Sequence, residues 1–117
     1  MYHIPRDRLD VDLLDPNDPF EIDMGNLPHL YKHVAGESGR FIALGPDDLL
    51  DVFLFGNPLF YPASEEGEAD WLLVGEVPGM VVTVPLAPPN TPDARRCRPI
   101  GIYAANDSLK RRYMDER

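Results

Sequence analysis

The chain has 117 residues, which is enough for one domain with a single hydrophobic core. A content of 44% hydrophobic and 26% charged residues is typical of globular proteins and excludes general disorder. The chain has no run of 18 apolar residues, and its N-terminus lacks the apolar core of a signal peptide, so we expect no membrane partner. The single cysteine, Cys97, favours a reducing, cytoplasmic location and is expected to be a buried apolar residue rather than a reactive thiol.

The net charge of -9 argues against simple electrostatic binding of nucleic acid. The charge is unevenly distributed, because residues 1–70 carry 15 acids and 4 bases whereas residues 94–117 carry 7 bases and 3 acids. Two interpretations of this basic end remain open. It could complement a helix dipole and the acidic body, or it could form a local anion site.

In chain order, residues 1–19 are rich in Asp and Pro and are expected to form an N-terminal arm, with a short strand near Tyr2–Ile4 or Phe20–Ile22. Residues 20–117 then form a single domain. Asn26 is a suitable N-cap for a short helix over Leu27–His33, which would place His29 and His33 on one face.

A brief extended segment over Arg40–Leu44 precedes a second helix, which begins at Pro46 and ends at Gly56. This helix is mostly apolar. Its acidic residues, Asp47, Asp48 and Asp51, predict a capped and solvated helix face, with a magnesium site as the minor alternative.

The second half of the chain predicts strands, followed by a last helix over Asp107–Glu116 that Asn106 caps. A turn at Val77–Gly79 joins two of the strands, and residues 87–96 form a loop. The expected strands are Leu59–Tyr61, Asp70–Glu76, Met80–Leu86 and Arg98–Ala104. We therefore expect an α+β fold, with a three- to four-stranded antiparallel sheet and helices packed on one face.

Few chemical motifs are present. No glycine-rich phosphate loop, zinc ribbon or serine-hydrolase elbow occurs. His29 and His33 allow three roles: structural packing, proton transfer or phosphate contact, or metal binding with Asp23 as a third ligand. The cations of the last helix, Lys110, Arg111 and Arg112, could bind an anion if they meet Arg98 of the preceding strand.

Several stretches together resemble the BrnT family, toxins with a RelE-like ribonuclease fold. The run Phe20-Glu21-Ile22-Asp23, with Asn26, His29 and His33, is similar to the family's F-E-W-D-x-x-N-x-x-H-x-x-x-H. The helix from Asp47 to Phe53 with the Asn57-Pro58 turn, the glycines Gly75 and Gly79, and the run Arg98–Tyr113 resemble later family motifs in the same order. The resemblance covers about residues 20–117.

The resemblance implies a metal-independent ribonuclease of a type II toxin–antitoxin system, without a cofactor and with a small DNA-binding antitoxin as partner. His29 and His33 would transfer protons, and Arg98 would complete the catalytic set. Lys32, Lys110, Arg111 and Arg112 would bind RNA.

The departures from the family pattern support an alternative function. Met80 stands where the family has Arg, Gly101 and Tyr103 replace polar groups, Leu109 replaces Glu, and residues 34–45 are an insertion. Losing one oriented donor of this kind typically lowers a rate by about 10²–10³-fold. The alternative is a catalytically degenerate relative that acts as a protein-binding module.

Overall fold

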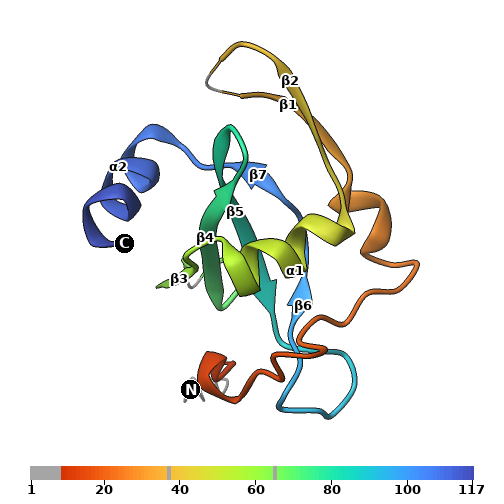
Figure 1. Ribbon diagram of the computed structural model, residues 1–117. Coiled ribbons are helices and arrows are strands. Elements are labelled where there is room, and N and C mark those ends of the chain that lie inside the picture. Colours follow the sequence, from red (N-terminus) through yellow and green to blue (C-terminus); the bar gives the residue numbers. More distant parts are fainter. Residues whose placement is uncertain (1–8, 37, 65) are drawn as a thin grey trace.

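The computed structural model describes residues 9–36, 38–64 and 66–117, and the strand expected near Tyr2–Ile4 lies outside these residues. Figure 1 shows a twisted antiparallel sheet with one helix in front of it, a second helix beside it, and a separate hairpin. Phe20–Ile22 forms no strand, but Phe20 makes an isolated parallel bridge to Cys97. The α+β class and the antiparallel pairing are therefore confirmed.

The main sheet is built around β4, Trp71–Val77, and β5, Met80–Ala87, with β3, Leu59–Pro62, on the outer side of β4. The other edge of β5 pairs with two short strands, β6, Arg98–Pro99, and β7, Tyr103–Ala104. These two short strands replace the continuous strand expected over Arg98–Ala104, so the main sheet has five strands within the described residues rather than the expected three or four.

A bulge explains this interruption. Between the pairs Thr83↔Tyr103 and Leu86↔Pro99, the outer segment has one residue more than β5. Pro85 lies in the gap and has no N–H to donate, although its carbonyl still accepts the N–H of Ile100 at 3.0 Å. The extra residue bends the edge at this point.

The helix α1, Pro46–Phe55, has the predicted bounds. A carboxylate oxygen of Asp48 accepts the N–H of Gly45 at 2.7 Å, and the N–H of Gly56 bonds the carbonyl of Val52 at the other end. The fully buried Leu49 and Val52 pack on the sheet face that carries Leu73. Gly75 permits this close contact, because a Cβ there would lie 2.6 Å from Cγ1 of Val52.

The last helix, α2, Asp107–Glu116, is capped as predicted, with the Asn106 side chain accepting the N–H of Leu109 at 2.8 Å. Its buried Tyr113 packs with Tyr61, Val74 and Val81 on the opposite sheet face from α1. The prediction that the helices cover one face is therefore wrong. The central strands are nearly continuously apolar, as expected for strands that are buried on both faces.

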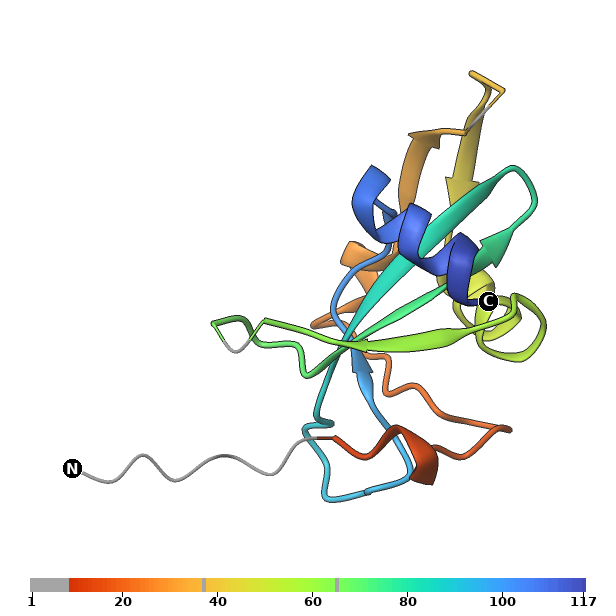
Figure 2. The same cartoon turned by 90° about the vertical axis from the view of Figure 1, so that its left-hand side faces the viewer.

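The predicted helix over Leu27–His33 is also wrong. A 3₁₀ helix, η2, spans only Leu27–Leu30, and the chain then extends into β1, Lys32–Ala35. β1 pairs with β2, Phe41–Leu44, in a two-stranded sheet of its own, which is not hydrogen-bonded to the strands of the main sheet (Figures 1 and 2). Backbone pairing with β2, together with packing of Val34 and Ile42 on the core, outweighs the local helical pattern.

The described part of the N-terminal arm lies against the domain. It contains a short 3₁₀ helix, η1, Val11–Leu13, between the buried Leu9 and Leu14. The N–H of Leu9 donates to Asp70 at 2.8 Å, and the indole N–H of Trp71 donates to the carbonyl of Leu9. No helix within the described ranges has the length and apolarity that a membrane crossing requires.

Candidate functional site

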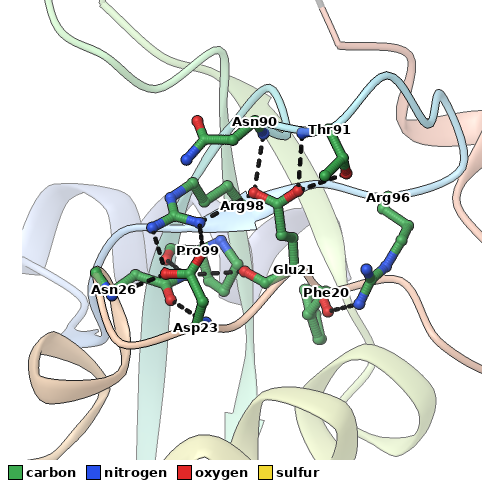
Figure 3. Close-up of polar contacts among 10 residues, drawn as sticks. Phe20, Glu21, Asp23, Asn26, Asn90, Thr91, Arg96, Arg98 and Pro99 are labelled. Carbon is green, nitrogen blue, oxygen red and sulfur yellow. Dashed lines mark hydrogen bonds and ion pairs between the residues drawn. The ribbon is translucent and has the colours of Figure 1, made fainter.

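Arg98 on β6 is held by two carboxylates from the segment that precedes η2. Its guanidinium donates to both oxygens of Asp23 at 2.8 Å and to Glu21 at 3.0 Å (Figure 3). The Arg98 side chain is only 13% exposed, and that of Glu21 only 8%. A bidentate pair of this kind fixes the guanidinium in one orientation and offsets its positive charge.

Glu21 also anchors the loop at residues 87–96. Its carboxylate accepts the backbone N–H groups of Asn90 and Thr91 at 2.8 and 3.1 Å, and the Thr91 hydroxyl at 2.7 Å (Figure 3). Burial alone would raise the pKa of Glu21, but these hydrogen bonds and that from Arg98 lower it to about 2. The carboxylate is therefore fully ionised at neutral pH.

Asp23 is more exposed than Glu21, but its carboxylate is also fully engaged in hydrogen bonds. The hydrogen bond from Arg98, followed by that from the Gly25 N–H, lowers the pKa of Asp23 to about 2. Asp23 and Glu21 in turn raise the pKa of the Arg98 guanidinium above its already high value. We call Glu21, Asp23 and Arg98 the ionic cluster.

Asn26 joins the ionic cluster to the sheet. Its side-chain NH₂ donates to the carbonyls of Glu21 and Pro99 at 2.9 and 2.8 Å, and its oxygen accepts the N–H of Asp23 (Figure 3). The sequence predicted that Asn26 caps η2, but its side chain makes no capping hydrogen bond. Arg96 adds a further link by donating to the Phe20 carbonyl at 2.6 Å.

The two predicted proton-transfer residues lie on different elements. His29 is in η2 and His33 is in β1, and both are exposed. They do not share a helix face, because the helix ends between them. The adjacent Lys32 places its ammonium 4.8 Å from the centre of the Tyr103 ring on β7.

The predicted RNA-binding cations of α2 lie away from Arg98. Figures 1 and 2 place α2 toward the upper end of the molecule and β6 toward the lower end. Arg112 pairs with Glu116 at 3.0 Å and stacks over Tyr61, and both Arg112 and Arg111 are exposed. The two groups of cations that could have formed one anion site are therefore separate.

Cys97 is buried, as predicted. Burial raises the pKa of its thiol to about 12, and the thiol donates to the Pro19 carbonyl at 3.4 Å. It is therefore a packing residue rather than a nucleophile. Among the described residues, no group of three or more His, Cys, Asp or Glu side chains is arranged to hold a metal ion.

The feature that the sequence prediction missed is the outer side of α1. Leu50, Leu54 and Phe55 are 36%, 42% and 79% exposed, although Leu49 and Val52 of the same helix are fully buried. Asp47 and Asp51 are exposed beside them. We call Asp47, Leu50, Asp51, Leu54 and Phe55 the α1 face.

The signal for this face was present in the sequence. Six of the ten residues of α1 are apolar, which is more than one side of a short helix can bury against a sheet. Exposed apolar side chains concentrated in this way are typical of interaction surfaces.

Hollows flank α1 on both sides. One, of about 380 Å³, lies between α1 and the segment 17–22, and Ile22 and Leu50 contribute apolar surface to it. The other, of about 520 Å³, lies between α1 and the β4–β5 turn and is bordered by Phe55 and Pro78. Asp51 borders both.

Comparison with known proteins gives no relative from which a function could be transferred. No protein-family model, curated protein or solved structure matches the chain. Its function must therefore be inferred from its own residues.

Proposed function

We propose that the chain is a protein-binding module that contacts its partner through the α1 face. The observation that carries this proposal is the exposure of Leu50, Leu54 and Phe55 on a helix whose other side is fully buried. Solvation of three large apolar side chains is unfavourable, and a partner that covers them would recover that free energy. The hollows beside the helix provide concave surface into which a partner can insert side chains.

The ionic cluster supports a binding function over a catalytic one. RNA cleavage requires cations that offset the negative charge developing on the phosphorane. Arg98 donates to two ionised carboxylates, so a phosphate would have to displace Asp23 and Glu21 to reach it. The ribonuclease predicted by the resemblance remains the alternative, with His29 and His33 as its proton-transfer groups.

The proposed partner is a protein of the kind that the resemblance predicts, namely a small DNA-binding antitoxin. Such proteins carry basic segments, which the acidic charge of this chain attracts at long range.

The test is selection of peptides from a randomised phage-displayed library on the purified chain, followed by affinity measurements on Phe55→Ser. We expect selected peptides to bind Phe55→Ser at least about tenfold more weakly, as for a central interface residue. Phe41→Ser is the matched control, since Phe41 is also 79% exposed but lies on β2. It should bind normally.

Failure to select any peptide, or an equal loss of peptide affinity in Phe55→Ser and Phe41→Ser, would overturn the proposal. Cleavage of an RNA pool in EDTA is measured in parallel with a His29→Ala/His33→Ala variant. Cleavage by the parent that is lost in this variant would establish the ribonuclease instead.

A further inference from the structure

We infer that the partner segment recognised by the α1 face is basic, rich in Lys and Arg, and carries apolar side chains that enter the hollows on either side of α1. This inference rests on the proposed binding function and specifies the chemistry of its ligand.

Both hollows combine apolar walls with carboxylates. The hollow beside the segment 17–22 has Phe20, Ile22 and Leu50 as apolar lining, with Asp18, Asp47 and Asp51 as acidic lining. The hollow beside the β4–β5 turn has Phe55, Val77 and Pro78 with Asp48, Asp51 and Glu76. Among the described residues, no Lys, Arg or His lines either hollow, so the charged side chains in these linings are all acidic.

Three of these carboxylates already have partners. Asp18 lies 3.4 Å from Arg96, Asp48 accepts the N–H of Gly45, and Glu76 accepts from Arg117 and Asn57. The attraction is therefore assigned to the exposed pair Asp47 and Asp51. These two lie four residues apart, about 6 Å along α1, and so present two negative charges in a row beside Leu50.

The negative charge of Asp47 and Asp51 determines which class of ligand fits the α1 face. An acidic or nucleic-acid ligand would meet like charge at both hollows, whereas a purely apolar segment would leave Asp47 and Asp51 beside an apolar surface. A basic segment pairs with them while its apolar side chains cover Leu50 and Phe55. Pairing at the rim also accelerates association with a chain of net charge -9.

The experiment uses the peptides selected from the phage-displayed library. We expect Lys and Arg to be enriched among them and their affinity to fall between about 50 and about 300 mM salt. Asp47→Asn/Asp51→Asn should weaken binding by about three- to tenfold, the effect of losing two exposed ion pairs. The matched control, Glu66→Gln/Asp115→Asn, changes the total charge equally at exposed positions outside both hollows and should bind as the parent does.

The outcomes separate this inference from the proposed function. Suppose that the selected peptides are neutral or acidic, and that they bind Phe55→Ser more weakly but bind Asp47→Asn/Asp51→Asn as they bind the parent. This result would overturn the inference of a basic ligand and leave the proposed binding function intact. Equal weakening in Asp47→Asn/Asp51→Asn and in its control would also overturn it, since long-range charge alone would then explain the effect. Absence of any Phe55-dependent peptide would overturn the proposed function itself.

Discussion

Around Arg98, each charged group of the ionic cluster is paired, and the surrounding chain is hydrogen-bonded to it. Along α1, by contrast, Asp47 and Asp51 stand exposed beside Leu54 and Phe55. Both regions contain acidic residues, on different elements of the chain. The first uses them to hold three separate segments of the chain together, whereas in the second they are exposed to solvent.

This difference shows that residue type alone does not identify a functional site. Arg98 resembles a phosphate-binding residue in the sequence, yet its surroundings make it a structural link between β6 and the segment before η2. The acidic helix positions resemble an ordinary solvated face, yet the apolar side chains beside them are unburied. The following predictions test whether the first region is structural and the second is not.

The largest effect is expected for Arg98→Ala. This substitution leaves Glu21 buried and ionised without its cationic partner, and we expect the free energy of unfolding to fall by about 3 kcal/mol. Urea denaturation measures the change. Arg111→Ala, at an exposed position on α2, is the control and should shift stability by less than about 0.5 kcal/mol. A loss below about 1 kcal/mol for Arg98→Ala would mean that the ionic cluster is not a structural link.

A somewhat smaller effect is expected for Gly75→Ala, which tests the support beneath the α1 face. The added Cβ would lie 2.6 Å from Val52 and 3.0 Å from the Gly56 carbonyl, so α1 must shift outward, at a cost of about 1–3 kcal/mol. Thermal unfolding measures it. Gly67→Ala is the control, because the nearest atom to its added Cβ is 4.0 Å away. Equal stabilities of the two variants would contradict the close packing of α1 on β4.

Acidification should destabilise the protein through the ionic cluster. The pKa of Glu21 and that of Asp23 are lowered to about 2 in the folded state, so their stabilising contribution is complete above about pH 5, where the unfolded chain is also ionised. It is lost as pH falls from about 5 toward 2, because the unfolded chain then binds protons first. Unfolding measured from pH 7 to 3 should show this decline, and Glu21→Gln/Asp23→Asn should flatten it. An equally steep decline in the variant would place the acid sensitivity elsewhere.

The smallest stability effect is expected on the α1 face. Asp51→Asn and Phe55→Ser should each change the free energy of unfolding by less than about 0.5 kcal/mol, because both side chains are exposed. Chemical denaturation of the same samples used for peptide binding measures this. A loss above about 1 kcal/mol would mean that these residues serve the fold.

Much of the fold could be predicted because local chemistry dictates it. Asn106 and Pro46 mark helix starts that the structure keeps, and the turn at Pro78-Gly79 closes the β4–β5 hairpin, with Gly79 at a φ of 90°. Cys97 is buried as expected. These features depend on a few neighbouring residues.

The remaining features depend on contacts between distant residues. Lys32–Ala35 becomes a strand because Phe41–Leu44 lies beside it, and Asn26 turns away from η2 to bond Pro99, 73 residues later. The partners of Arg98 come from 75 and 77 residues earlier in the chain. No local pattern encodes such pairings, and the separation of Arg98 from the cations of α2 follows from the same long-range packing.

The hydroxyl of Tyr113 gives the protein a built-in reporter. It donates to the carbonyls of Gly56 and Asn57 at 3.0 and 2.8 Å, directly after Phe55, while its ring is fully buried beneath α2. A ligand that moves the end of α1 relative to Tyr113 would change the geometry of these bonds. A fluorine-labelled tyrosine at this position would therefore register occupancy of the α1 face in its resonance frequency, from the opposite side of the sheet and without a label in the contact itself.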